Sequence, residues 1–148
     1  MNEKIPETEI ELEDWMKKNC YNFDSYSVNG NFIWEGYGID KNGPLYYWYY
    51  TEHGQKNNLE IFRSEKEIIE FAFTQISSDK WAKTHCIGFT LDEHKSSKLS
   101  EILKKQKIDF IQDKIPFYAD KPAFRTFVLG CDIKQSEYLK TEFYEELK

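Results

Sequence analysis

The segment Pro44-Leu45-Tyr46-Tyr47-Trp48-Tyr49-Tyr50-Thr51-Glu52-His53-Gly54 contains five consecutive aromatic residues and ends at a glycine. Successive side chains of a β-strand point to opposite faces, so this run divides into two sets. Because large aromatic rings lie on both faces of the strand, both faces must be shielded from water. We expect a helix layer against one face, and a second layer, a rim of hydrated tyrosine hydroxyls or a partner molecule on the other. The sets are Leu45, Tyr47 and Tyr49 on one face, and Tyr46, Trp48 and Tyr50 on the other.

The residues around this run predict a meander of four strands. Asn29-Gly30 and Asn42-Gly43 are turn dipeptides, because Asn-Gly readily takes the positive φ angles of a type I′ turn. The first is expected to close a hairpin, and the second leads into the aromatic run. Gly54 then turns the chain into the next strand. The four expected strands are residues 21–28, residues 32–37, the aromatic run and residues 59–63.

Three Ser/Thr-x-x-Glu capping boxes predict helices that begin after Thr8, Ser64 and Thr90. The second helix carries a broad apolar arc, so we expect it to pack most deeply against the sheet. The third has a sparse apolar stripe and many lysines, which is typical of a solvated outer helix. Asp132 is expected to cap a final helix. Further strands are expected at residues 81–89, 108–117 and 124–129.

These elements follow one another in the order α-β-β-β-β-α-β-α-β-β-α. Strands and helices that do not alternate regularly favour the α+β class, in which helices pack against one face of a mainly antiparallel sheet. We therefore predict about six to seven strands, including the N-terminal four-strand meander, with about four helices. At 148 residues, without a linker or internal repeat, the chain is expected to form a single α+β domain over residues 1–148.

Composition limits the classes of partner. The chain has 26 acidic and 20 basic residues, a formal net charge of −6, which argues against nucleic acid and anionic membranes as partners. No apolar run is long enough to span a membrane and no signal peptide is evident, so we expect a cytoplasmic location. Cys20, Cys86 and Cys131 are odd in number and widely spaced, and we expect reduced thiols.

The histidines and cysteines do not predict a metal site or a nucleophile. His85 and Cys86 are adjacent, with His94 and Cys131 farther along the chain, but zinc ligands usually come in pairs two to four residues apart. A Cys–His nucleophile pair could be assembled from any chain with three of each residue type. We therefore expect neither a metal nor another cofactor.

Carboxylates and lysines are equally weak signals of catalysis or nucleic-acid binding. Glu35, Asp40 and Glu52 lie in the meander, whereas a glycosidase needs two carboxylates facing each other in a deep cleft. The lysines between Lys95 and Lys107 have no interleaved aromatics or arginines, so a solvated helix face is favoured over an RNA contact. We expect no catalytic residue, and a protein that is not an enzyme.

Acidic residues gather near both ends of the chain. Six lie between Glu3 and Asp14 against one lysine, and four more lie in the expected last helix. If these segments shared a face, their charge would steer a basic protein by long-range attraction. The alternative is a pair of ordinary helices with acidic outer faces.

The stretch Tyr49-Tyr50-Thr51-Glu52-His53-Gly54, the following Leu59-Glu60-Ile61-Phe62, a helix from Ser64 and Asp79-Lys80-Trp81-Ala82 resemble small bacterial immunity proteins that accompany polymorphic toxins. In those families an aromatic strand ends in a Tyr-Ser/Thr-Glu-Arg-Gly turn, followed by a short strand and an amphipathic helix. His53 stands here in place of the arginine. The resemblance covers residues 45 to 90. It implies a stoichiometric inhibitor that binds a cognate toxin domain, often a nuclease, and has no chemistry of its own.

Tyrosine and tryptophan suit such a binding role, because they supply large, rigid contact areas at small entropic cost. Acidic groups beside them would add rate and specificity against a basic partner. The alternative is a small-ligand or carbohydrate-binding module that uses the aromatic strand as a platform, which a deep pocket with converging polar groups would favour. The expected partner contacts are Tyr46, Trp48 and Tyr50 as anchors, with Glu35, Glu52 and Glu60 as charged contacts.

Overall fold

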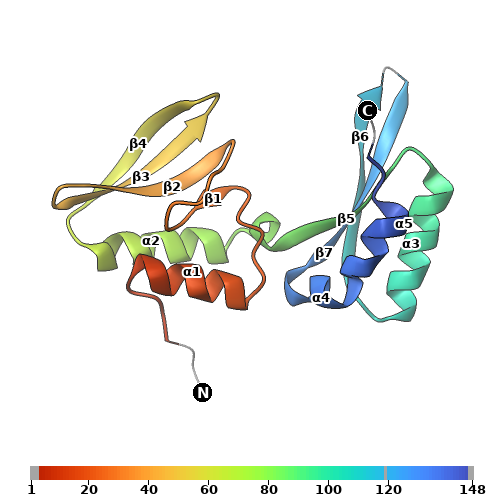
Figure 1. Cartoon of the computed structure of the whole chain (residues 1–148), viewed down its shortest axis with the longest axis horizontal. Coiled ribbons are helices and arrows are strands. Elements are labelled where there is room, and N and C mark those ends of the chain that lie inside the picture. The colour runs from red at the N-terminus through yellow and green to blue at the C-terminus, as the bar shows by residue number, and fades with distance from the viewer. Residues whose placement is uncertain (1–3, 119, 147–148) are drawn as a thin grey trace. The chain divides into compact units, whose positions relative to one another are not determined.

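A computed structural model describes residues 4–118 and 120–146 of the chain. Residue contacts divide the chain into two compact units, residues 1–83 and 84–148. The predicted α+β class and the order of elements are confirmed (Figure 1). Within the described residues, the seven strands form two sheets, one of four strands and one of three. The expectation of one domain over residues 1–148 stays a prediction.

The first unit contains a four-stranded sheet in the order β1-β2-β3-β4. Neighbours among β2, β3 and β4 are antiparallel. Helices α1 and α2 lie on one side of this sheet (Figure 1). The elements are α1 (Glu9–Lys18), β1 (Tyr26–Ser27), β2 (Gly36–Asn42), β3 (Leu45–Glu52), β4 (Gln55–Phe62), α2 (Glu65–Ser77) and the 3-10 helix η1 (Lys80–Lys83).

The first strand pair differs from the predicted hairpin. β1 has only two residues and runs parallel to β2, with Tyr26 opposite Tyr37. Asn29 and Gly30 do take positive φ angles, 62° and 89°. However, the Asn31 side chain accepts a hydrogen bond from the Val28 backbone N–H and donates to backbone carbonyls of the preceding segment, so the loop folds back. The hairpin prediction is wrong because Asn-Gly fixes the local turn but not the direction of the chain beyond it.

The core of the first unit lies between the sheet and its two helices. Buried apolar residues of α1 (Leu12 and Met16) and of α2 pack with Trp48 of β3. Deep packing of α2 is confirmed, because four of its residues are buried. Thr8 and Glu11 form the predicted capping box of α1, with both reciprocal hydrogen bonds present. The buried residues of α2 are Ile68, Ile69, Ala72 and Ile76.

The second unit contains a three-stranded antiparallel sheet in the order β5-β7-β6. Helices α3 and α5 contact this sheet and each other (Figure 1). The elements are β5 (Thr84–Thr90), α3 (Glu93–Lys105), β6 (Phe110–Tyr118), β7 (Lys121–Leu129), η2 (Gly130–Asp132), α4 (Ile133–Ser136), η3 (Glu137–Leu139) and α5 (Lys140–Phe143).

Two helix predictions in the second unit are wrong in detail. Asp92 rather than Thr90 caps α3, since its carboxylate accepts a hydrogen bond from the His94 backbone N–H at 2.9 Å. The single helix expected after Asp132 is instead a series of short 3-10 and α-helical turns that ends at Phe143.

The cysteines differ among themselves. Cys86 is a free thiol, and burial raises its pKa. Cys20 and Cys131 do not titrate, because they are disulfide-bonded. The expectation of reduced thiols therefore holds at Cys86 and is wrong at the other two positions.

No helix among the described residues is both long and apolar enough to cross a membrane. The same part of the chain contains no group of three or more histidine, cysteine, aspartate or glutamate residues that could hold a metal ion.

Candidate partner-binding site

Three of the six predicted contact residues meet at one end of the first sheet. The Tyr50 hydroxyl lies 2.8 Å from Glu35 Oε1 and 3.1 Å from Glu52 Oε2. A phenol carries one proton, so it must share a single donor between two carboxylates. The hydrogen bond to Glu35 raises the pKa of Tyr50, with further increases from burial and from the bond to Glu52. We call Glu35, Tyr50 and Glu52 the acidic cluster.

Local backbone geometry places the two carboxylates of this cluster. Glu52 is the last residue of β3 and lies two positions beyond Tyr50, so both side chains are on the same face of the sheet. His53 and Gly54 follow with φ angles of 51° and 76°, as a two-residue type I′ hairpin turn requires. Glu35 precedes Gly36, where a Cβ would overlap the Ser25 carbonyl, so only glycine fits there.

A stack of rings connects the acidic cluster to the core. Tyr37 contacts Tyr50 with ring centroids 5.1 Å apart, and it stacks on Trp48 at 5.7 Å with an angle of 9° between the planes. Trp48 in turn makes an edge-on contact with Phe71 of α2 at 5.5 Å. Because each ring is held by the next, the Tyr50 hydroxyl is presented from a rigid support.

The other predicted contacts lie elsewhere. Trp48 is only 3% exposed and belongs to the core, so its prediction as a surface anchor is corrected. Tyr46 is partly buried against the same core. Glu60 is exposed on β4 opposite Trp48, four positions and about 13 Å along β3 from Glu52, so it does not join the acidic cluster.

Two exposed rings just before Glu35 in the sequence were not predicted as contacts. Phe32 is 74% exposed and Trp34 is 83% exposed, and their rings meet edge to face at 5.1 Å. The alternation of residues 32–37 predicted a strand there, but both rings lie in the loop before β2. The glycines on either side of this segment, Gly30 and Gly36, are the feature of the sequence that indicates a loop. We call Phe32 and Trp34 the aromatic pair.

Charged partners distinguish the acidic cluster from the acidic helices. Glu142 of α5 and Glu145, which follows this helix, pair with Lys98 and Lys95 at 3.1 and 3.0 Å. In α1, Glu11 is engaged by its capping box and by Lys4 at 3.6 Å. Glu3 lies outside the described residues. Neither carboxylate of the acidic cluster has an ion-pair partner among residues 4–118 and 120–146, so its charge is not neutralised locally.

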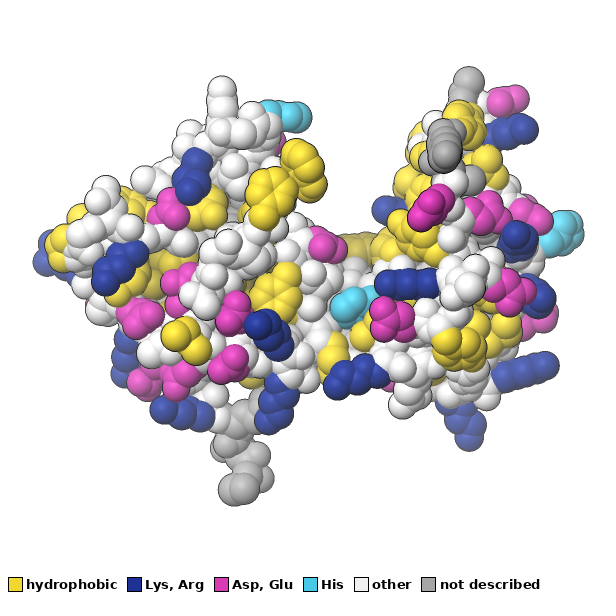
Figure 2. Space-filling model, viewed as in Figure 1, with side chains coloured by type: hydrophobic (Ala, Val, Ile, Leu, Met, Phe, Trp, Pro, Cys, Tyr) yellow, Lys and Arg dark blue, Asp and Glu magenta, His cyan; other side chains and the backbone are white. Residues whose placement is uncertain are grey.

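The net charge of the chain resides in one unit. Residues 1–83 contain 15 acidic and nine basic residues, whereas residues 84–148 contain 11 of each. Figure 2 shows exposed hydrophobic side chains among acidic ones on the surface of the first unit. The field of this unit therefore attracts cations toward a surface that also offers exposed rings.

Comparison with protein-family models, curated proteins and solved structures finds no match for this chain.

Proposed function

We propose that this protein is an immunity protein that binds and neutralises a cognate bacterial toxin domain of the basic nuclease type. It acts as a stoichiometric inhibitor and performs no catalysis. The observation that carries this proposal is the exposed Trp34 ring next in sequence to Glu35 of the acidic cluster, on a unit with an excess of acidic residues. The resemblance of residues 45 to 90 to immunity proteins adds to it.

The chemistry of this surface favours a basic protein partner. Exposed tryptophans are frequent hot spots of protein interfaces, because they bury a large area at small entropic cost. Two carboxylates that share one donor retain acceptor capacity for a lysine or arginine side chain. Trp34 and Phe32 also offer ring faces and edges to a cation or its alkyl stem.

Co-expression tests the function. Where the reading frame immediately upstream encodes a large secreted protein, the C-terminal domain of that protein is the candidate toxin. We expect its expression alone to arrest growth, co-expression with this protein to restore growth, and the two proteins to purify as a complex. Failure of both rescue and complex formation would refute the proposal.

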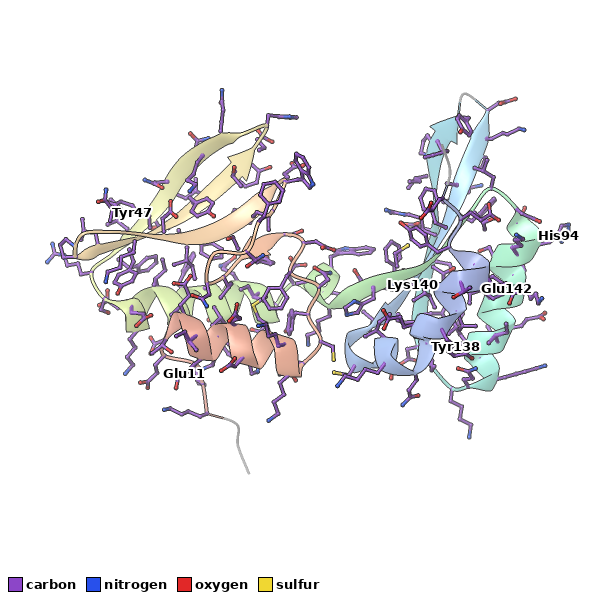
Figure 3. All side chains as sticks on the ribbon, in the orientation of Figure 1. Glu11, Tyr47, His94, Tyr138, Lys140 and Glu142 are labelled. Carbon is purple, nitrogen blue, oxygen red and sulfur yellow. The ribbon has the colours of Figure 1, made fainter. Side chains whose placement is uncertain are left out.

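Substitutions on the proposed surface then test whether it binds the toxin. Trp34→Ala is expected to weaken the complex by about 30-fold, the typical loss at a hot spot. Glu35→Gln with Glu52→Gln is expected to slow association, most strongly at low salt. The matched controls are Tyr138→Ala and Glu142→Gln in the second unit, where Tyr138 is also exposed (Figure 3). If every variant of the first unit still restores growth, this surface is not the binding site, although the proposed function stands.

A further inference from the structure

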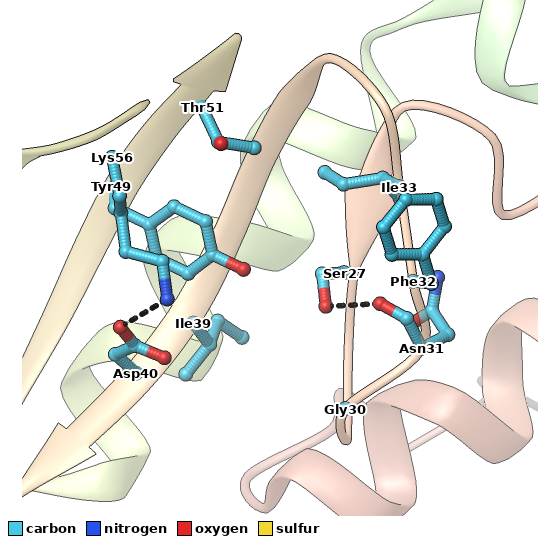
Figure 4. A pocket seen from close by; sticks show the side chains of 10 residues that line it. All are labelled: Ser27, Gly30, Asn31, Phe32, Ile33, Ile39, Asp40, Tyr49, Thr51 and Lys56. Carbon is cyan, nitrogen blue, oxygen red and sulfur yellow. Dashed lines mark hydrogen bonds and ion pairs between the residues drawn. The ribbon is translucent and has the colours of Figure 1, made fainter. Parts of the chain in front are cut away.

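A pocket of about 370 Å³ opens on the first unit between the β1–β2 loop and the face of β2 and β3 (Figure 4). Its volume falls within the usual range of small-ligand pockets, about 300–1,000 Å³. It is distinct from the acidic cluster, because Thr51 of β3 lines it whereas Tyr50 and Glu52 do not. Its lining residues are Ser27, Gly30, Asn31, Phe32, Ile33, Ile39, Asp40, Tyr49, Thr51 and Lys56.

Tyr49 supplies an unused polar group to this pocket. The residue is only 6% exposed, and its side chain lies across β2 above Gly38, where a Cβ would overlap the hydroxyl. Among the described residues, no group forms a hydrogen bond with this hydroxyl, which points into the pocket (Figure 4). The Tyr49 hydroxyl is not among the buried polar atoms that lack a partner, so it is open to the pocket and can hydrogen-bond a ligand group.

The charged groups of the pocket cancel each other. Lys56 Nζ lies 2.8 Å from Asp40 Oδ2, and the same ammonium group lies 4.2 Å from the centre of the Tyr49 ring. This ion pair offers one donor group and one acceptor group side by side with no net charge. The ammonium also occupies a face of the Tyr49 ring, so this ring is not a stacking platform.

Apolar side chains complete the pocket. Ile33 and Ile39 are almost fully buried, whereas Phe32 is 74% exposed and forms part of the lining. A ligand that fits must therefore present apolar C–H groups on one side and several hydroxyl groups on the other. The Asp40–Lys56 pair carries no net charge, so it does not favour a ligand of either net charge.

We infer that this pocket binds a neutral sugar, a monosaccharide or disaccharide. Tyr49 Oη and the Thr51 hydroxyl bind ring hydroxyls, and Asp40 and Lys56 bind a vicinal pair of hydroxyls as acceptor and donor. Ile33 and Phe32 cover the C–H face of the ring. This inference goes beyond the proposed function and does not depend on it.

An NMR titration of the ¹⁵N-labelled full chain tests the inference. The probes are glucose, galactose, mannose and N-acetylglucosamine, with glucuronate and glucosamine as charged comparators. We expect at least one neutral sugar to shift the backbone amides of residues 38–40 and 49–51 with a Kd of about 1 mM, as is reasonable for a small ligand. The charged comparators should bind more weakly.

Tyr49→Phe removes only the hydroxyl and leaves the ring above Gly38, so the fold should be retained and can be checked in the same spectra. We expect it to weaken binding about tenfold, the loss of one well-placed hydrogen bond. Tyr47→Phe is the matched control, since Tyr47 lies on the same strand and does not line the pocket. Absence of shifts with every neutral sugar, equal binding by Tyr49→Phe, or tighter binding of a charged comparator would overturn the inference.

Discussion

At the scale of single residues, Tyr21 and Tyr26 show how differently two buried hydroxyls are satisfied. The Tyr26 hydroxyl donates to Asp79 Oδ2 at 2.8 Å. The Tyr21 hydroxyl is buried without a hydrogen-bond partner among the described residues. An unpaired buried hydroxyl costs about 1–3 kcal/mol, whereas a hydrogen bond to a charged group stabilises by about 1.5–3 kcal/mol.

Substitution by phenylalanine should therefore have opposite effects at these two positions. Tyr21→Phe is expected to raise the free energy of unfolding by about 1 kcal/mol, because it removes the unpaired group. Tyr26→Phe is expected to lower it by about 1–2 kcal/mol, because Asp79 loses its donor. Urea unfolding of both variants measures the difference. Destabilisation of equal size in both would show that the Tyr21 hydroxyl has a partner.

The Tyr21 hydroxyl also makes the free energy of unfolding depend on pH. Burial raises the pKa of Tyr21 to about 12, whereas the unfolded chain releases this proton near pH 10. Between these values the folded state holds the proton and the unfolded state does not, so stability is lost as pH rises. Urea unfolding from pH 9 to 11 should show a decline that is smaller in Tyr21→Phe, by up to about 1.4 kcal/mol per pH unit. An equal decline of the free energy of unfolding with pH in the unsubstituted protein and in Tyr21→Phe would contradict this prediction.

At the scale of elements, Gly38 determines how β2 and β3 pack. The Tyr49 ring crosses β2 at Gly38, its register partner, where no side chain stands in the way. This places Tyr49 among the buried residues, although it belongs to the set opposite Trp48. Tyr47, two positions earlier, lies on the side of the sheet away from α1 and α2 (Figure 3).

Gly38→Ala should therefore destabilise the first unit by about 1–3 kcal/mol, the usual cost of overpacking. The backbone of Gly38 does not have a positive φ, so strain of the backbone does not contribute. Tyr49→Ala in the same chain should remove most of this penalty. A double-mutant cycle of urea unfolding checks this coupling, and additive effects would reject it.

Short sequence patterns predicted most helices and strands of the fold, but not which strands pair with each other. The Thr8 capping box and the apolar arc after Ser64 depend on neighbouring residues, so both helices appear where the sequence places them. The pairing of β1 with β2 depends instead on the Asn31 side chain and a loop of several residues. No short sequence pattern encodes that arrangement.

The candidate site was predictable to a similar degree. Glu35, Tyr50 and Glu52 were predicted from composition and resemblance, and the structure brings them together. Alternation correctly separated Trp48 from Tyr49, but it did not show which set faces the helices. Burial of Trp48 follows from α2, and burial of Tyr49 follows from Gly38. Both causes are tertiary contacts.

At the scale of the whole molecule, each unit has its own buried apolar residues. Every member of the core cluster around Trp48, from Leu12 to Ala82, lies within residues 1–83. The second unit buries a separate group that includes Ile87, Leu103 and Phe143. A unit that has its own buried core is expected to fold by itself.

A fragment of residues 1–83 is therefore expected to fold alone. It should keep the near-ultraviolet circular dichroism of the stacked Tyr37 and Trp48 rings and unfold cooperatively in urea. The matched measurement is the same spectrum of the full chain. A featureless spectrum or a non-cooperative transition would favour the single cooperative domain predicted from the sequence.

Trp34 and Trp48 differ most in exposure among the four tryptophans, and they become two separate optical probes when Trp15 and Trp81 are replaced by phenylalanine. An indole that is 83% exposed is open to collisional quenchers and emits at longer wavelength, whereas one that is 3% exposed is shielded. A partner that covers the aromatic pair would protect the first emission component and leave the second unchanged. A disturbance of the ring stack would alter the second. Fluorescence of that variant can thus distinguish docking at the surface from rearrangement of the core.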